Sequence, residues 1–230
     1  MPIRIHGQSS DYEPSIQGIG DIDEVRVKGI GVVWKGIEII DDFEDGSATN
    51  WTVPSSTGSD TIVGGLDGTD HAWRLNGFRE GHLRGSDAVD RGAQPGDTFE
   101  YLFQIDSFGS GDALFRYMFA ASGVNDGNCY YMEYEMNSTD PDVAIYKESG
   151  GNVQTTSEFK ALNPRPSDTV RAVVRWNYGN ARIDVEHYLN GNHVHTLSIT
   201  DSEYTQPGTA LFVNANLVVT IDELKITDST

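Results

Sequence analysis

The sequence predicts an all-β fold: an antiparallel two-sheet jelly-roll sandwich with a short N-terminal β-hairpin extension. Three observations lead to this prediction. Short segments that alternate apolar and polar residues recur along the 230-residue chain, Gly, Asn, Asp and Ser separate them, and no window of helical length keeps a 3.6-residue period. About a dozen such strands pack best as two antiparallel sheets around one core.

The N-terminal residues 1–39 differ from the rest of the chain. The stretch IGDIDEVRVKGIGVVWKGIEII predicts a strand over 22–28, a glycine turn over 29–31 and a second strand running from 32 to 40. One hairpin cannot bury both of its faces and is marginal in water. We therefore expect residues 1–39 to be an attachment or assembly segment that packs on another surface, and residues 40–230 to be the jelly-roll domain.

The sandwich is predicted to open with the acidic stretch EIIDDFEDGSATNW. Residues 39–44 would form its first strand, with Phe43 and Trp51 in the core and the acids of the stretch in water. Further strands are expected over 71–77, 96–108, 113–122, 128–137, 143–149, 169–176, 181–189, 193–199 and 208–227.

Residues 181–189 show the half-buried antiparallel pattern most clearly. Ile183, Val185, His187 and Leu189 fall on one face, and charged residues and a tyrosine fall on the other. Asn190–Gly191 then supplies a two-residue hairpin turn, whose positive-φ positions suit Asn and Gly.

The formal net charge of −19 narrows the classes of partner. The 35 acidic residues are dispersed along the chain and only five of the 16 basic residues are lysine, which indicates adaptation to high salt, where charges are screened within a few ångströms. An ordinary acidic extracellular protein is the alternative. Nucleic acid is not an expected partner, because no basic face exists to neutralise phosphates.

Cysteine content and hydropathy exclude several further classes. The single cysteine, Cys129, rules out an intramolecular disulfide and a cysteine-based zinc site, and its strand-like surroundings predict a buried, inert thiol. No stretch is apolar enough for a membrane span, so no membrane insertion is expected. The N-terminal residues lack the apolar core of a signal peptide, and we expect no export by that route.

Four segments, taken in order, resemble concanavalin A-like (laminin G-like) jelly-roll domains. They are DDFEDGSATNW, GDTFEYLFQID, the hairpin VRWNYGNARIDVEHYLNGNHV and the closing GTALFVNANLVVTIDELKI. The resemblance covers roughly residues 40–228. It implies the jelly-roll fold and says less about activity.

A second resemblance concerns the N-terminal segment. VRVKGIGVVWKG is similar to short strand–Gly–Trp–Lys modules near the ends of tailed-virus structural proteins. With the acidic composition, it implies a structural protein of a tailed virus of halophilic archaea, assembled in the host cytoplasm and displayed on the virion surface. We then expect a homo-oligomer that contacts other virion proteins through residues 1–39 and a host-surface glycan or glycoprotein through the jelly roll.

Two carboxylates invite comparison with glycosidases. Glu133 and Glu135 project from one strand face about 7 Å apart, a distance at which paired carboxylates hydrolyse glycosides. Laminarinase-type relatives of this fold carry an E-x-D-x-x-E arrangement, and here position 137 is Asn. No catalytic motif is complete, so a non-enzymatic protein is expected, with a solvated acidic strand face as the simpler interpretation.

Metal ligands are sought among histidines and acids. His193 and His195, with His187 across the hairpin, could face one way and bind a transition metal, although structural histidines fit the pattern as well. Calcium is the metal that the composition favours, because it takes several hard oxygen ligands. The opening and closing strands lie together in such folds, which would bring Asp41, Asp42 and Glu44 near Asp222 and Glu223. No other cofactor is expected.

Sugars stack on exposed aromatic rings beside polar side chains. The candidate ligand-binding residues are Trp73, Tyr178, Asn180, Asn190 and Asn192. Trp73 alternates with Leu75, so a core position is its alternative role.

Three functions follow from these observations. The favoured one is a non-enzymatic virion protein, capsid- or tail-associated, whose jelly roll binds neighbours or host-surface glycans. The alternatives are a glycoside-acting enzyme that uses Glu133 and Glu135, and a free carbohydrate-binding or adhesion module of a halophile.

Overall fold

The computed structural model of the protein describes residues 15–16, 20–21, 24–27, 31–35, 38–53, 58–66, 68–77, 79–83, 95–121, 127–136, 141–177, 180–206 and 208–228. Within these ranges every regular element is a β-strand, and the predicted all-β fold is confirmed. The described part of the chain contains no helix with the length and hydropathy of a membrane span.

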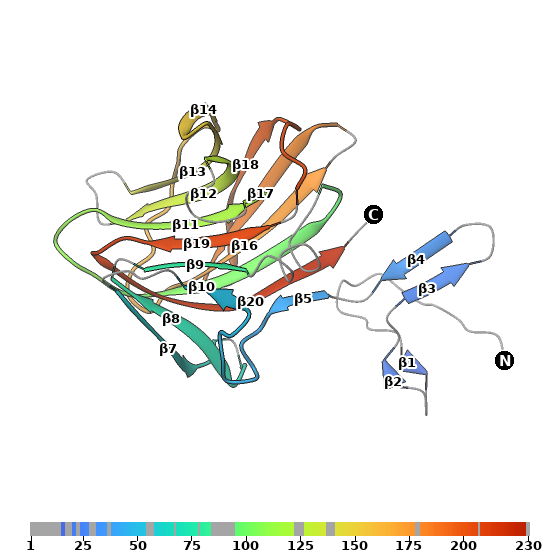
Figure 1. Cartoon of the computed structure of the whole chain (residues 1–230), viewed down its shortest axis with the longest axis horizontal. Coiled ribbons are helices and arrows are strands. Elements are labelled where there is room, and N and C mark those ends of the chain that lie inside the picture. The colour runs from blue at the N-terminus through green and yellow to red at the C-terminus, as the bar shows by residue number, and fades with distance from the viewer. Residues whose placement is uncertain are drawn as a thin grey trace.

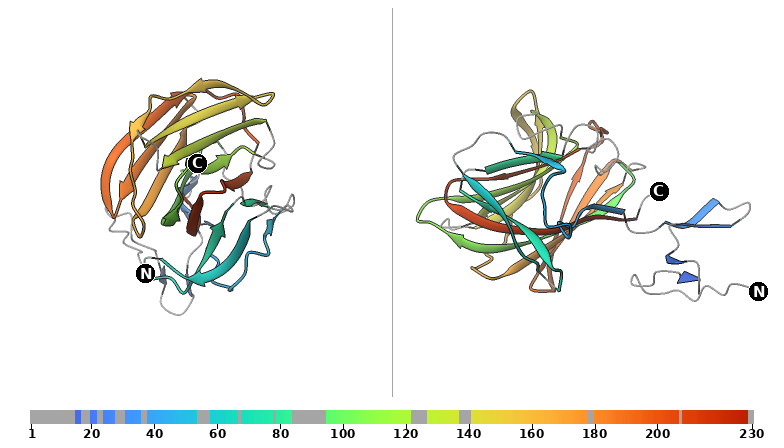
Figure 2. Two further views of the ribbon diagram at one scale, coloured as in Figure 1. Left: turned by 90° about the vertical axis from the view of Figure 1, so that its left-hand side faces the viewer. Right: turned by 60° about the horizontal axis from the view of Figure 1, so that its bottom comes forward.

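Two antiparallel eight-stranded sheets form the sandwich, and Figures 1 and 2 show them as two curved layers. Sheet I has the order β18 (Asn192–Thr200), β17 (Arg182–Leu189), β16 (Thr169–Asn177), β10 (Thr98–Phe108), β20 (Leu217–Asp228), β8 (His71–Asn76) and β7 (Ser59–Gly64), and β5 (Glu38–Asp41) also pairs with β20. Sheet II has the order β14 (Asn152–Thr156), β13 (Asp142–Ser149), β12 (Asn128–Met136), β11 (Ala113–Phe119), β19 (Thr209–Val213), β9 (Arg79–Leu83) and β6 (Trp51–Thr52), and β15 (Lys160–Ala161) pairs with β13.

Aromatic side chains fill much of the space between the sheets. Alternate residues of each central strand point inward, and the rings of Tyr101 from sheet I and Tyr117 from sheet II stack with centroids 3.9 Å apart. Phe103 of sheet I packs edge-on against Tyr134 of sheet II at 4.9 Å. Because each buried ring removes a large apolar area from water, these contacts hold the two sheets together.

The opening strand forms where the sequence predicts it, with different bounds. β5 ends at Asp41, and its pairing of Asp41 with Leu224 places the first sandwich strand beside the closing strand. Phe43 and Trp51 are buried as predicted. The prediction that Asp41 lies in water is wrong, because this residue is buried and only 7% exposed. Its carboxylate accepts hydrogen bonds from the Phe43 amide at 3.0 Å and from Trp51 Nε1 at 2.7 Å, which replace the lost hydration.

The predicted hairpin of 181–199 also forms, with one change of register. Asn190 and Gly191 make its turn at φ 49° and 77°. A bulge lies between His187 and Tyr188, so that His187 pairs with His195 and Tyr188 pairs with His193. His195 therefore shares the inner face with His187, whereas His193 is exposed beside Tyr188.

The N-terminal segment contains the predicted hairpin, in which β3 (Glu24–Val27) pairs with β4 (Gly31–Lys35). A second, shorter pair joins β1 (Ser15–Ile16) to β2 (Gly20–Asp21). Figure 1 shows both pairs to one side of the sandwich, beyond β5. Among the described residues, these four strands pair only with each other.

Candidate functional site

The predicted ligand-binding residues do not form one site. Trp73 is fully buried, its indole packs over the Cα of Gly81, where a Cβ would lie 2.6 Å from the ring, and its Nε1 donates to Asp60 at 3.2 Å. A ring enclosed in this way cannot stack on a sugar. The core alternative for Trp73 is the observed one.

The predicted polar ligands lie in separate turns. Asn180 precedes β17 and Asn190 follows it, so the length of an eight-residue strand, about 26 Å, separates them. Asn190 accepts a hydrogen bond from the Thr169 amide at 2.9 Å, and Asn192 Nδ2 donates to the Asn190 carbonyl at 3.1 Å. These contacts stabilise the hairpin turn. Tyr178 lies outside the described residues.

The four predicted calcium ligands are engaged separately in loop contacts. Besides Asp41, Asp42 accepts from the Glu44 amide at 3.2 Å, and Glu44 accepts from the amides of Asp70 and His71, each at 3.0 Å. Asp222 is fully buried and accepts from the Leu66 amide at 2.7 Å and from the Thr69 hydroxyl. No group of three potential metal ligands occurs among the described residues, so the geometry gives the calcium prediction no support.

The inner histidines belong to the core. Burial, together with the smaller effects of the nearby His195 and His193, lowers the pKa of His187 to about 3. Its Nε2 lies 3.0 Å from the Tyr134 hydroxyl, which in turn lies 2.6 Å from the Tyr101 hydroxyl. The bulge turns His193 away, so the three histidines do not converge as a metal site requires.

The outer face of sheet II carries a set of residues that sequence reasoning did not bring together. In β12, Tyr130, Met132, Tyr134 and Met136 enter the main core, so Tyr131, Glu133 and Glu135 point away from it. The same alternation directs Arg116 of β11, Phe212 of β19 and Tyr146 of β13 outward. The pairing registers place these residues side by side: Tyr131 opposite Tyr146, and Arg116 opposite both Glu133 and Phe212.

An apolar platform forms one half of this face. Met118, Ala121, Cys129, Tyr131 and Ala210 make a second buried cluster, separate from the main core, and the half-buried Tyr146 packs against it. The rings of Tyr131 and Tyr146 stack at 5.0 Å, and Phe159, which is 56% exposed, meets Tyr146 edge-on at 6.2 Å. Cys129 is buried, as the sequence predicted.

Arg116 and Glu133 form the polar centre of the face. Arg116 Nε donates to Glu133 Oε2 at 2.6 Å, and the guanidinium lies 4.9 Å from the Tyr131 ring centroid and 5.7 Å from that of Phe212. The Arg116 side chain keeps a third of its surface exposed. A flat cation held between two aromatic rings offers donors and stacking surface to the same ligand.

Acidic residues surround this centre. Glu135, next to Glu133 on β12, lies opposite Asp142 of β13, and Glu80 of β9 lies opposite Phe212. Burial raises the pKa of Glu135, and the neighbouring charges of Asp142, Asp112 and Glu133 raise it further. The face therefore combines aromatic rings with closely spaced carboxylates.

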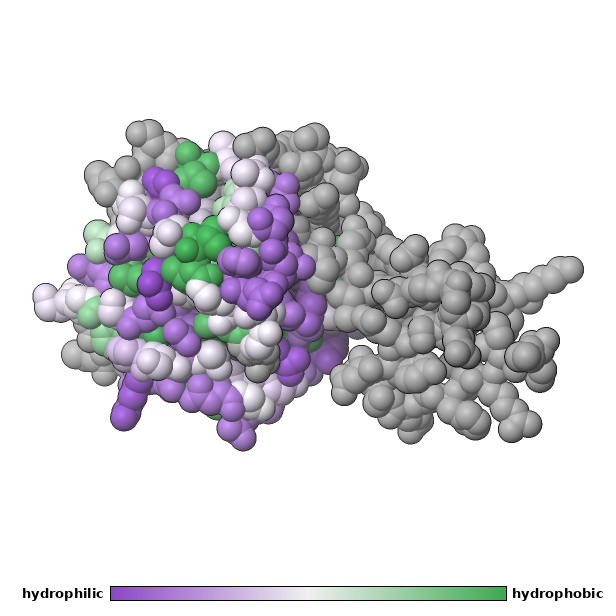
Figure 3. Space-filling view, turned by 90° about the horizontal axis from the view of Figure 1, so that it is seen from below, coloured by the Kyte–Doolittle hydropathy of each residue, from purple (hydrophilic) through white to green (hydrophobic). Residues whose placement is uncertain are grey.

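The outer face of sheet I is different in kind. Arginines on this face form ion pairs with neighbouring acids: Arg74 with Asp106 at 2.8 Å, Arg171 with Glu100 at 3.1 Å and Arg182 with Asp184 at 2.7 Å. Figure 3 views the molecule from the side of β7 and β8, where hydrophilic surface surrounds small hydrophobic islands. This is the composition of a hydrated face.

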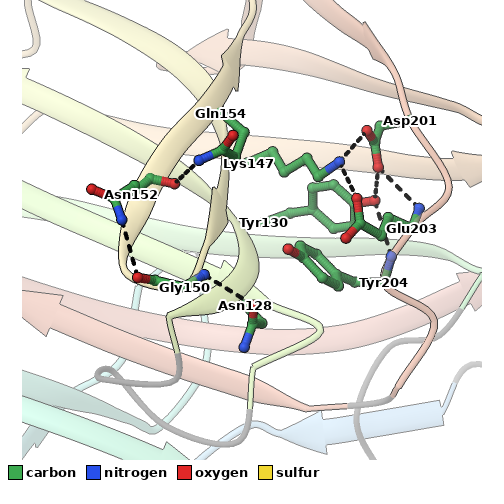
Figure 4. A network of polar contacts seen from close by, with 9 residues as sticks. All are labelled: Asn128, Tyr130, Lys147, Gly150, Asn152, Gln154, Asp201, Glu203 and Tyr204. Atoms are coloured by element: carbon green, nitrogen blue, oxygen red, sulfur yellow. Dashed lines mark hydrogen bonds and ion pairs between the residues drawn. The ribbon is translucent and has the colours of Figure 1, made fainter.

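A polar network closes one end of the sandwich (Figure 4). Lys147 of β13 donates to Asp201 at 2.7 Å and to Glu203, and Tyr130 donates to the same Asp201. Hydrogen bonds to Asp201 and Glu203 raise the pKa of Lys147, and its Nζ lies 5.6 Å from the centroid of the Tyr204 ring. The network fastens the segment after β18 to sheet II.

No family model matches the chain, and no curated protein is similar to it in sequence. Many solved structures share its fold. A glycoside hydrolase family 16 endo-glucanase from Bacteroides ovatus superposes with a TM-score of 0.55 at 13% identity, over 81% of this chain and 98% of that one. The carbohydrate binding module CBM66 from Bacillus subtilis gives 0.52 at 17% identity, over 77% and 95% of the two chains. Peanut lectin gives 0.52 at 10% identity, over 78% and 91%. At these identities the similarity establishes the jelly-roll fold.

Proposed function

We propose that the protein is a non-enzymatic glycan-binding module and that the outer face of sheet II is its binding surface. The observation that carries the proposal is the Arg116 centre, in which a partly exposed guanidinium lies between Tyr131 and Phe212 and beside Glu133. Sugar rings present C–H faces to aromatic rings and hydroxyls to charged side chains, and this face supplies both. The fold, shared with structures described as a carbohydrate-binding module and as lectins, is compatible with the role.

A glycan array tests the proposal, with Arg116→Met as the informative variant. We expect the wild type to bind and Arg116→Met to lose at least about tenfold in affinity, because the substitution removes both the planar cation and its hydrogen-bond donors.

Arg171→Met is the matched control. Arg171 also lies over a tyrosine, 4.4 Å from the Tyr188 ring, and also pairs with a glutamate, but it belongs to sheet I. It should bind like the wild type. Equal losses in both variants, or no glycan signal for the wild type, would contradict the proposal.

The same face supports a glycosidase as a second candidate function. Glu133 and Glu135 point outward as predicted, which leaves a glycosidase as the second candidate. The ion pair of Glu133 with Arg116 supports a binding role, because it engages the carboxylate with a neighbouring side chain. Release of reducing sugar from array-positive glycans by the wild type, abolished in Glu133→Gln, would favour the enzyme.

We further propose that residues 1–39 attach this module to a virion, where it is displayed as a homo-oligomer on a tailed virus of a halophilic archaeon. The separate pairing of β3 with β4 and the dispersed acidic charge support this role. Because β5 begins at Glu38, the informative truncation is residues 38–230. We expect it to be a soluble monomer by light scattering while the full chain oligomerises. If both assemble alike, the attachment role is wrong.

A further inference from the structure

The charge of the outer face of sheet II indicates which class of glycan it binds. This inference rests on the proposed function. Among the described outward-facing residues of this sheet, Arg116 is the sole arginine or lysine, and it is already paired with Glu133. The described acids on the same face are Glu80, Glu133, Glu135, Asp142 and Glu148.

These acids lie close enough to act together. Glu135, Asp142 and Glu133 raise the pKa of the Tyr146 hydroxyl through their charges, after burial, which is the largest cause. Burial raises the pKa of the Tyr131 hydroxyl, the Arg116 charge lowers it, and the charges of Glu133 and Glu148 raise it. The half-buried Tyr146 ring, on which a sugar would stack, thus lies in a negative potential.

We infer that this face selects neutral glycans and rejects those that carry carboxylate or sulfate groups. A carboxylated sugar on the half-buried Tyr146 ring would meet the charges of Glu133, Glu135 and Asp142, and the described residues of this face include no arginine or lysine outside an ion pair to receive it. A neutral sugar meets the same oxygens as hydrogen-bond acceptors for its hydroxyls. Charge therefore sets specificity here, and the aromatic rings set affinity.

The pairing registers indicate the shape of the ligand. The partly exposed Glu133, Arg116 and Phe212 follow one another across β12, β11 and β19, and the half-buried Tyr146 lies on the next strand, β13. This row runs across the strands, with neighbouring strands about 4.8 Å apart. A chain of several sugar units fits this path better than a single terminal sugar.

The test compares three forms of one ligand. The neutral glycan with the strongest array signal is oxidised at its primary alcohols to the uronate, and part of the uronate is methyl-esterified, which restores neutrality with little change of shape. In about 0.1 M salt we expect the uronate to bind at least about tenfold more weakly than both neutral forms, and in about 1 M salt less than about threefold more weakly.

A variant links the rejection to the acids. Glu135→Gln should reduce the penalty on the uronate about threefold in 0.1 M salt, whereas Glu223→Gln, the same change on sheet I, should leave it unaltered. Preferential binding of the uronate, or of sulfated glycans on the array, overturns the inference and leaves the proposed function intact. If the methyl ester binds as weakly as the uronate, the loss of affinity comes from a change of shape and not from charge, and the inference is wrong. Absence of binding to every glycan removes the proposed function itself.

Discussion

The two outer faces of the sandwich use the same residue types for different purposes. Each has an arginine over a tyrosine and beside a glutamate: Arg116 with Tyr131 and Glu133 on sheet II, and Arg171 with Tyr188 and Glu100 on sheet I. On sheet II the tyrosine is 2% exposed and belongs to a buried cluster. On sheet I the tyrosine is only partly buried, and ion pairs continue on either side of it.

The difference shows that an ion pair does not reveal the role of a surface. On sheet I the pairs satisfy charges on a face that water covers, and such exposed pairs contribute little to stability. On sheet II the pair holds a cation between two rings on an otherwise acidic face. What distinguishes the faces is the set of accessible rings around the sheet II pair, the exposed Phe159 and the partly exposed Tyr146 and Phe212, because aromatic surface outside the core is what a ligand can use.

The largest expected contrast is in stability. Tyr131→Ala should lower the free energy of unfolding by about 3–4 kcal/mol, because it empties the centre of the second buried cluster. Tyr188→Ala should cost less than about 1 kcal/mol. Urea denaturation followed by tryptophan fluorescence measures both, and equal losses would remove the distinction between the faces.

The dependence of stability on pH tests the interior between the two faces, where His187 is buried. The pKa of His187 in the folded protein is about 3, below its ordinary value near 6.5, so the unfolded state binds the proton more readily. The wild type should therefore lose stability as the pH falls below about 6.5. At about pH 4.5 the contribution of His187 is on the order of 2–3 kcal/mol.

His187→Gln isolates this effect. The variant should show a flatter dependence of the unfolding free energy on pH than the wild type over the range from about 6.5 down to 4.5. Parallel curves would mean that acid sensitivity arises elsewhere, at the outer carboxylates.

Side-chain titrations sharpen the comparison further. Burial and the charges of Asp142, Asp112 and Glu133 raise the pKa of Glu135 on sheet II. On sheet I, burial is the largest influence on Glu186 and raises its pKa, but hydrogen bonds from Tyr188 and Arg175 lower it overall. Carboxyl NMR should show shifts of opposite sign, and shifts of the same sign would contradict the two electrostatic descriptions.

The smallest expected effect is that of salt on an exposed pair. Arg175, with a side chain 48% exposed, pairs with Glu186. Arg175→Gln should cost at most about 0.5 kcal/mol in 0.1 M KCl and close to nothing in about 1 M KCl. A larger, salt-independent cost would show that sheet I depends on its ion pairs.

Much of the fold could be predicted from the sequence because alternation is a local signal. β12 is an example: the alternation of its inner Tyr130, Met132, Tyr134 and Met136 with its outer glutamates is visible within nine residues. β7, β9 and β14 escaped prediction. Their sequences, SDTIVG, REGHL and NVQTT, are short and contain few apolar residues, so no period stands out.

The candidate site could not be predicted in the same way, because its members are distant in sequence. Phe212 meets Arg116 only because β19 pairs with β11, and no local pattern records that pairing. The calcium prediction shows the complementary limit. The opening and closing strands do pair, but Asp41 and Asp222 turn to nearby amides and an indole, and such short-range choices depend on side-chain geometry.

The place of β20 within sheet I has a consequence for how the protein is made. This strand lies between β10 and β8, yet of the described strands it is the last to leave the ribosome. Until β20 has been synthesised, β8 and β10 lack the strand that joins them, and the backbone groups on their facing edges stay unpaired. We therefore expect the native sheet to form only after residues 217–228 have left the ribosome, with chaperones protecting the earlier strands and with chains interrupted before residue 217 being degraded.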